Sequence, residues 1–182
     1  MEETKEMSFD YNKITFGTLN EGVNTVIEIP KGSMLKVEWD RKQQFFVLDR
    51  VEPGIFAKPC NYGFIPQTLD EDGDELDTLV VTSEPIPMGV VLEKARVIGV
   101  VNFEDDSEMD HKVIVVPEDD RHYGKIEKWE ELGEAWKKQI EHHFNHYKDL
   151  KKPGTTNVMG FADSAAAWKI IEECIERAKN EQ

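Results

Sequence analysis

The hydrophobic periodicity of this chain changes once, near residue 120, and that change limits the folds open to it. Before this point, short runs rich in Val, Ile and aromatic residues are separated by Gly, Pro and Asp. After it, apolar residues recur every three or four positions, as on one face of a helix. No repeat or long low-complexity linker divides the 182 residues. The sequence therefore predicts one α+β domain over 1–182, with 1–8 as a flexible tail.

Six segments have the composition of short strands. Each contains β-branched or aromatic residues and is bounded by turn residues, a pattern typical of a small barrel or sandwich. The predicted strands are 24–29, 34–39, 45–51, 76–82, 90–103 and 112–116.

Two helices are expected in the second part of the chain. The first runs from about Trp129 to Tyr147, and Pro153-Gly154 prevents its continuation. The second covers 164–179, with Asp163 as its N-cap. We expect both helices to lie against the barrel.

Composition excludes several classes of protein. The formal net charge of −15 argues against binding nucleic acid through the surface field. No apolar run approaches the ~20 residues of a membrane span, and the acidic start of the chain does not read as a signal peptide. We therefore expect a cytoplasmic protein in which Cys60 and Cys174 are reduced thiols.

A run of carboxylates, Glu-Asp-Gly-Asp-Glu-Leu-Asp, opens the predicted strand at 76–82. Asp72, Asp74 and Asp77 would repel one another there unless cations neutralised them. Oxygen ligands favour Mg²⁺, Mn²⁺ or Ca²⁺ over Zn²⁺. The alternative is a solvated acidic turn, because 37 of 182 residues are Asp or Glu. An EF-hand is excluded, since its sixth and twelfth positions would be Glu75 and Val81 rather than Gly and Glu.

Further polar residues join this acidic run. A second acidic loop covers 104–110 and is followed by Lys112, while Tyr147 and Lys148 end the long helix. Lys36 shares a strand face with a glutamate two residues later. Carboxylates for metals, together with Lys, Arg and Tyr for phosphate oxygens, are the composition of a phosphoryl-transfer site.

The order of these motifs resembles one enzyme family, the soluble inorganic pyrophosphatases of family I, in their short prokaryotic form. The resemblance covers about 24–150. It rests on Glu28 in Val-Ile-Glu-Ile-Pro, Lys36-x-Glu38, Arg50, Cys-Asn-Tyr-Gly-Phe-Ile-Pro at 60–66, Asp-Gly-Asp-x-Leu-Asp at 72–77, Arg96, Asp105, Asp110-x-Lys112 and His-Tyr-Lys-Asp-Leu at 146–150.

The resemblance implies a five-stranded OB-type β-barrel with two main flanking helices and Mg²⁺-dependent hydrolysis of pyrophosphate to two orthophosphates. Several Mg²⁺ ions per site would serve, with Mn²⁺ or Zn²⁺ as substitutes. The implied metal ligands, direct or through water, are Asp72, Asp77, Asp105, Asp110, Glu28 and Glu38.

The same resemblance implies roles in the reaction. Asp74 would be the general base, accepting a proton from a water that bridges two metals, and Tyr62 would lie near that nucleophile. Lys36 and Arg50 would stabilise the departing phosphate during the reaction. The implied substrate-binding residues are Lys36, Arg50, Lys112, Tyr147 and Lys148.

One position departs from the family pattern. Lys58 stands where many members carry a tyrosine before Pro-x-Asn-Tyr-Gly. The lysine could contact phosphate or point to solvent, and the second is the prediction.

The resemblance also implies a homo-oligomer, with a hexamer favoured, in which His142 and His146 of the long helix contact another subunit rather than bind a metal. Two other functions remain to be weighed. A nucleic-acid-binding OB module would need a basic groove, and a Ca²⁺-binding scaffold would leave the lysines without a task.

Overall fold

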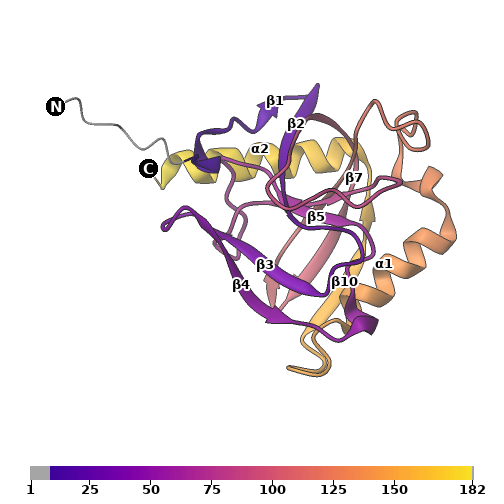
Figure 1. The fold of residues 1–182 in the computed structure, drawn as a ribbon. Coiled ribbons are helices and arrows are strands. Elements are labelled where there is room, and N and C mark those ends of the chain that lie inside the picture. The colour runs from indigo at the N-terminus through magenta and orange to yellow at the C-terminus, as the bar shows by residue number, and fades with distance from the viewer. Residues whose placement is uncertain (1–8, 182) are drawn as a thin grey trace.

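The computed structural model describes residues 9–181, so the predicted tail over 1–8 lies outside the described residues. Five strands form a closed ring in which all neighbours are antiparallel except β6 and β9 (Figure 1). β7 closes the ring by pairing with both β9 and β2. In order around the ring the strands are β2 (Gly22–Ile29), β5 (Asn61–Phe64), β6 (Asp77–Val80), β9 (Lys112–Val116) and β7 (Val91–Asp105). The predicted five-stranded OB-type barrel is confirmed.

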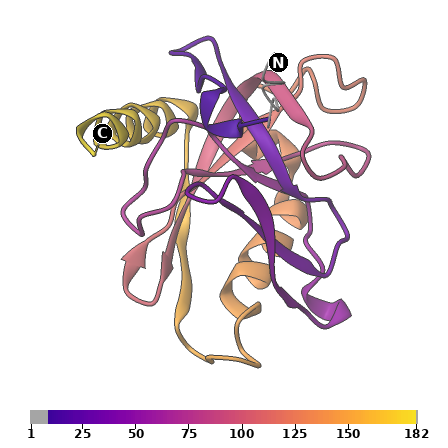
Figure 2. The same ribbon diagram turned by 60° about the vertical axis from the view of Figure 1, so that its left-hand side comes forward.

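Strands outside the ring extend it or stand apart from it. β10 (Thr156–Ala162) and the short β8 (Glu108–Met109) pair with β7, and the short β1 (Gly17–Thr18) pairs with β2. β3 (Leu35–Asp40) and β4 (Phe45–Val51) form a separate two-stranded hairpin, visible below the barrel in Figures 1 and 2. Two of the six predicted strands therefore belong to this hairpin and not to the barrel.

The sequence did not predict β5 or β10. Only four residues long, β5 is buried at every position, so it shows no alternation of apolar and polar side chains. β10 contains Gly160 at φ 144° and several polar residues. Both strands form because they are hydrogen-bonded between or beside stronger strands, which local composition does not reveal.

The predicted helix over 129–147 is divided in two. A 3-10 turn, η3 (Trp129–Leu132), precedes α1 (Glu134–His146), and Gly133 between them has φ 86°. That left-handed conformation is open to glycine at little cost and separates the two segments. The last helix, α2 (Ser164–Asn180), starts as predicted: the backbone N–H of Ala166 donates to the Asp163 carboxylate at 2.9 Å. Two further 3-10 turns are η1 (Tyr11–Lys13) and η2 (Gly54–Phe56).

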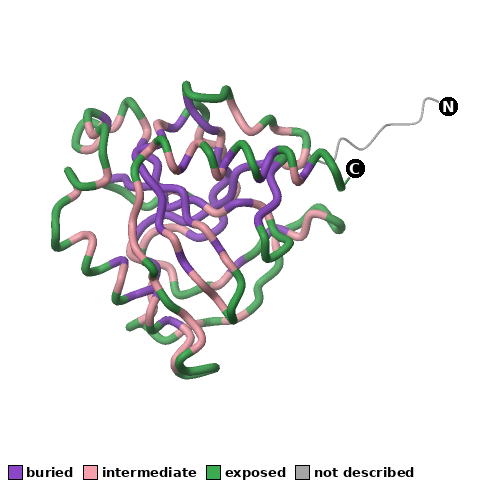
Figure 3. Tube along the Cα trace, turned by 180° about the vertical axis from the view of Figure 1, so that it is seen from behind, coloured by how far each residue is buried: buried purple, intermediate pink, exposed green. Residues whose placement is uncertain are grey.

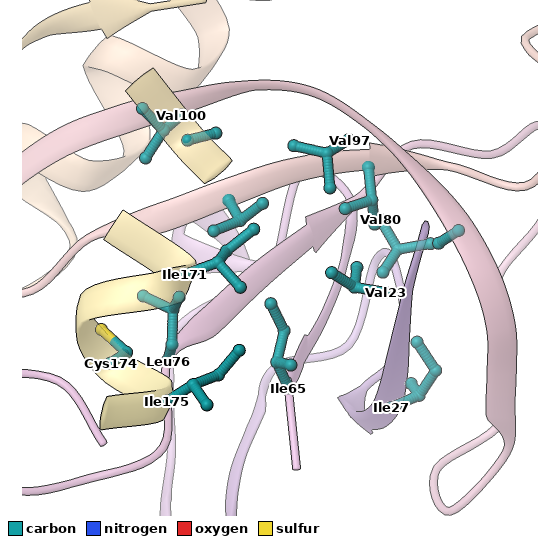
Figure 4. Packing of buried hydrophobic residues seen from close by; sticks show 14 residues of the cluster. Val23, Ile27, Ile65, Leu76, Val80, Val97, Val100, Ile171, Cys174 and Ile175 are labelled. Carbon is teal, nitrogen blue, oxygen red and sulfur yellow. The ribbon is translucent and has the colours of Figure 1, made fainter. Parts of the chain in front are cut away.

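The helices cover the barrel through two apolar clusters. In Figure 4, Ile171, Cys174 and Ile175 of α2 pack against barrel residues that include Leu76 and Val80. α1 contributes Ile140 and Phe144 to a second cluster with Tyr62 and Phe103. Buried segments accordingly gather at the centre of the molecule (Figure 3).

β9 shows how both clusters depend on one strand. Val113 and Val115 belong to the cluster with α2, whereas Ile114 and Val116 belong to the cluster with α1. Because successive side chains point to opposite faces, all five residues of β9 are buried. Among residues 9–181, no helix combines the length and the apolar character that crossing a membrane requires.

Candidate active site

One cavity of about 560 Å³ collects the residues predicted for the site. Its walls come from the β3–β4 hairpin, the barrel strands β2, β5 and β6, the ends of β7 and α1, and the loop before β6. Every predicted site residue except Lys112 lines it. Those residues are Glu28, Lys36, Glu38, Arg50, Tyr62, Asp72, Asp74, Asp77, Asp105, Asp110, Tyr147 and Lys148.

The acidic loop before β6 is a tight turn. The Asp70 N–H donates to the Asp74 carbonyl at 2.8 Å, and the Asp74 N–H donates to the Asp72 carboxylate at 3.1 Å. Gly73 between them has φ 92°, a conformation that disfavours other residues. The turn leaves Asp72 and Asp74 exposed at the mouth of the cavity.

Lys112 lies behind the cavity wall and holds two of the carboxylates. Asp77 and Lys112 are partners in the parallel β6–β9 register, and the Lys112 Nζ lies 2.7 Å from Asp77 Oδ2. The same ammonium pairs with Asp110, and the Tyr62 hydroxyl donates to Asp77. Burial lowers the pKa of Lys112, but Asp110 and Asp77 outweigh it and the pKa is raised.

The residues after α1 meet the end of β7 at the cavity. The Tyr147 hydroxyl donates to Asp105 Oδ2 at 2.9 Å, and the Lys148 ammonium pairs with the same oxygen. The second oxygen of Asp105 is buried and accepts no hydrogen bond from any residue in 9–181. A buried carboxylate oxygen without a donor is costly unless a cation or water satisfies it.

The hairpin supplies the remaining cations. Lys36 and Arg50 are cross-strand partners, and Lys36 Nζ lies 2.7 Å from Glu38 Oε1. Arg50 pairs with Asp49 and Glu52 beside it. The four predicted phosphate-binding cations, Lys36, Arg50, Lys112 and Lys148, therefore each have a carboxylate partner.

Burial raises the pKa of several carboxylates of the cavity and so favours their neutral form. It raises the pKa of Glu28 to about 8, with repulsion from Asp77 adding to the effect. Burial likewise raises the pKa of Asp110 to about 7 and that of Asp72 to about 6. The Trp39 N–H donates to Glu28 at 2.7 Å and fixes its orientation.

The donor set fits divalent cations that prefer oxygen. The candidate ligands are all carboxylates, and Asp105, which carries the orphaned oxygen, lines this cavity. Within residues 9–181, no three His, Cys, Asp or Glu side chains are already arranged around one point for a metal. Asp77, Asp105 and Asp110 instead contact lysines, so the predicted ligand set stays a prediction.

Comparison with known proteins identifies the family. The family model for inorganic pyrophosphatase matches residues 25–179. The chain belongs to the inorganic pyrophosphatase family. It is 59% identical over 171 residues to an inorganic pyrophosphatase of Neisseria meningitidis, covering 92% of this chain and 96% of that protein. A Haemophilus influenzae inorganic pyrophosphatase is 55% identical, with coverage of 92% and 97%.

Solved structures agree with the sequence relatives. The crystal structure of an inorganic pyrophosphatase from Neisseria gonorrhoeae matches with a TM-score of 0.90 and 57% identity, covering 93% of this chain and 99% of that one. The Thermus thermophilus pyrophosphatase structure matches with a TM-score of 0.86 and 40% identity, covering 94% and 99%. The predicted pyrophosphatase family and the predicted enzyme class, an inorganic diphosphatase, are confirmed.

The prediction for Lys58, where this pyrophosphatase chain departs from the family pattern, is wrong. Its side chain does not point to solvent: the residue is only 8% exposed and lines the cavity. Its Nζ lies 4.4 Å from the centre of the Tyr62 ring. The chain bends at Pro59 and Cys60, so the contact between Lys58 and Tyr62 depends on the fold and no local pattern indicates it.

A support cluster behind the acidic loop was also missed. Asp70, 3% exposed, accepts a hydrogen bond from the His111 N–H at 2.9 Å. Cys174 and Arg177 of α2 lie 3.6 and 3.8 Å from the same carboxylate. This contact ties α2 to the loop that carries Asp72. No local pattern could have found it, because its members come from three distant segments.

Three other residues named above do not line the cavity. Arg96 donates to the carbonyl oxygens of Gly124 and Ile126, a contact that holds a loop in place. His142 and His146 are exposed on α1, with ring centres 4.7 Å apart.

Proposed function

We propose that this chain hydrolyses inorganic pyrophosphate to two orthophosphates with Mg²⁺ as its cofactor. The observation that carries the proposal is the convergence of six carboxylates and, apart from Lys112, the predicted phosphate-binding side chains on one cavity of a pyrophosphatase-family fold. Pyrophosphate is multiply anionic, so attack on it requires neutralisation of its oxygens. A cavity that combines carboxylates for cations with lysines and an arginine meets that requirement.

The carboxylates that would hold Mg²⁺, directly or through water, are those of Asp72, Asp77, Asp105, Asp110, Glu28 and Glu38. When bound, divalent ions neutralise phosphate oxygens and make water more acidic. The raised pKa values of Asp72, Asp110 and Glu28 support this use, because a nearby cation would restore their negative charge. Mn²⁺ and Zn²⁺ are proposed as substitutes.

Asp74 is the proposed general base. It lines the cavity at its exposed mouth, where water reaches it, and the lysine ion pairs of the inner wall do not include it. Burial raises its pKa, which makes the carboxylate a stronger proton acceptor. Asp74 would accept the proton of the attacking water, while Tyr62 holds Asp77 in place.

The cations and Tyr147 are proposed to bind the phosphate oxygens. Lys36 and Arg50 are cross-strand partners in the hairpin, and Lys148 and Tyr147 line the same cavity. Arrival of the substrate would draw these side chains from their present carboxylate partners. The carboxylates so released would be free to bind the metal ions.

The deciding experiment measures phosphate release from pyrophosphate with Mg²⁺, with Ca²⁺ and with EDTA. We expect turnover with Mg²⁺, little with Ca²⁺, whose longer and looser coordination misplaces reacting groups, and none with EDTA. A Ca²⁺-binding scaffold would release no phosphate under any condition. A nucleic-acid-binding OB module would show salt-dependent binding to single-stranded oligonucleotide instead.

We also propose a cytoplasmic homo-oligomer, with a hexamer favoured. Several large apolar side chains of β3, β4 and the following turn are exposed in the single chain, among them Leu48, Val51 and Ile55. Such side chains are typical of surfaces that another subunit covers. Cys60 and Cys174 are buried free thiols, which suits a reducing compartment. Sedimentation of the purified protein measures the assembly.

A further inference from the structure

Lys58 is the buried cation of the cavity that has no anionic partner within residues 9–181; Lys42, which also lines the cavity without a carboxylate within 4.0 Å, is exposed. The four predicted phosphate-binding cations each pair with a carboxylate. Within residues 9–181, no carboxylate oxygen lies within 4.0 Å of the Lys58 Nζ, and this atom donates no hydrogen bond to the protein. The side chain is nevertheless more than nine-tenths buried, since only 8% of the residue is exposed.

Three aromatic rings lie around the ammonium. Its Nζ lies 4.4 Å from the Tyr62 ring centre, 5.2 Å from that of Tyr147 and 5.4 Å from that of Phe144. Ring faces attract a cation, but less strongly than an ion pair does. The hydroxyls of both tyrosines are turned away to carboxylates, Tyr62 to Asp77 and Tyr147 to Asp105. The rings therefore direct the ammonium toward the cavity without neutralising it.

The backbone fixes this placement. The Lys58 N–H donates to the Ser33 carbonyl at 3.0 Å, and its carbonyl accepts from the Gly32 N–H at 2.9 Å. The residue is thus held on both sides by the turn before β3, which carries Lys36. Burial, together with repulsion from Lys36 and Lys112, lowers the pKa of Lys58 to about 7. A cation in such a position is destabilising unless an anion joins it.

We propose that the Lys58 Nζ binds a phosphate oxygen of the substrate and of the orthophosphate product, as an additional substrate-binding residue of this chain. The inference rests on the proposed function and adds a contact that the resemblance did not assign. A phosphoryl group in the cavity would place a negative charge beside this lysine, which has no carboxylate partner among residues 9–181. The hydrogen bond would be charge-assisted at both ends and therefore among the stronger kinds.

The proposal predicts that removing the charge of Lys58 weakens phosphate binding without lowering the free energy of unfolding. Replacing Lys58 by Met keeps a flexible chain of similar length among the three rings but removes the buried charge. Without ligand, the variant should be as stable as the unmodified protein or more stable, because an uncompensated buried cation has been removed. Phosphate should bind more weakly. If Lys58 served only to anchor the tyrosine rings, the variant would be less stable instead.

The experiment measures two quantities in Lys58→Met, Lys58→Arg and Lys138→Met. The last is a control that removes an exposed lysine of α1. Calorimetric titration with inorganic phosphate in Mg²⁺ buffer gives affinity, and thermal unfolding in metal-free, phosphate-free buffer gives the Tm. We expect Lys58→Met to weaken phosphate binding about ten- to a hundredfold with no loss of Tm, Lys58→Arg to retain part of the affinity, and the control to change neither.

Unchanged phosphate affinity in Lys58→Met overturns the proposal, and so does a lower Tm or a failure to fold, since either shows a structural anchor. The titration does not depend on turnover. Should the unmodified protein bind phosphate through Lys58 but fail to hydrolyse pyrophosphate, the proposed function falls and this binding contact stands.

Discussion

Asp77 of β6 and Lys112 of β9 occupy one register position of the parallel strand pair, with Lys112 Nζ 2.7 Å from Asp77 Oδ2. Since the same ammonium also pairs with Asp110, the lysine sets the spacing of two carboxylates that the family resemblance assigns to metal. Tyr62 donates to Asp77 from the neighbouring strand β5. Asp77 is therefore the carboxylate that both Tyr62 and Lys112 contact.

Replacing Asp77 with Ala should nearly abolish turnover. The change removes a proposed metal ligand and the acceptor of both Tyr62 and Lys112, and metal-assisted charge stabilisation accounts for several kcal/mol of catalysis. We expect kcat to fall about a thousandfold or more at saturating Mg²⁺. Asp119→Ala, which removes an exposed carboxylate, is the control and should retain full turnover. Retention of more than a tenth of the activity would contradict the role of Asp77.

Replacing Asp74 with Asn should lower the rate more than it lowers Mg²⁺ affinity. A general base contributes roughly a hundred- to ten-thousandfold, and the amide cannot accept the proton. The measurement is kcat as a function of Mg²⁺ concentration, with Asp72→Asn beside it as a variant of a proposed ligand. Equal losses of rate and Mg²⁺ affinity in Asp74→Asn would refute its assignment as the base.

Glu28 should make the metal-free protein less stable as pH rises. Burial raises its pKa from 4.5 to about 8, so the folded state binds this proton more tightly than the unfolded state does. The stabilisation is complete below about pH 4.5 and is lost as pH rises through about 8. Glu28→Gln cannot ionise, so its Tm advantage over the unmodified protein should grow from pH 5 to pH 9 in EDTA.

The matched control for this comparison is Glu93→Gln, which alters an exposed glutamate. Its Tm difference from the unmodified protein should stay constant over the same range. Parallel Tm curves for Glu28→Gln and the unmodified protein would show that Glu28 does not retain its proton in the folded state.

Replacing Gly63 with Ala should disrupt the strand that carries Tyr62. A Cβ at this position would overlap the backbone carbonyl oxygen of Val26 on β2, so the two strands would have to separate. We expect a loss of about 2 kcal/mol or more in the free energy of unfolding. Gly54→Ala is the control, because its Cβ would meet only the Met34 sulfur at 3.8 Å. Denaturant unfolding of both variants decides, and equal stabilities would count against the close strand contact.

Local sequence patterns predicted some elements of the fold correctly. The strands at 45–51 and 112–116 match the structure, and Asp163 caps α2 as expected. Closure of the five-stranded barrel could be predicted only from the family resemblance. It depends on the pairing of β7 with β2 and β9, which no local pattern shows. β5 could not be read locally, since a strand buried on both faces carries no alternation.

The site divides in the same way. Motif order was sufficient to name residues that the structure brings to one cavity, but it gave no information on their partners. The pairing of Lys112 with two aspartates depends on strand register, and the burial of Lys58 depends on packing against Tyr62 and Phe144. Composition alone favours solvent for a lysine, and only the aromatic rings around it reverse that preference.

The parallel pairing of β6 with β9 bears on how the enzyme regains activity after denaturation. Asp77 and Lys112 are 35 positions apart in sequence, so their contact requires closure of a long loop and cannot form early from local structure. Refolding chains whose helices have already formed would still lack this part of the candidate site until the two strands align. Recovery of turnover during refolding would thus report the alignment of β6 with β9, later than the return of helical circular dichroism.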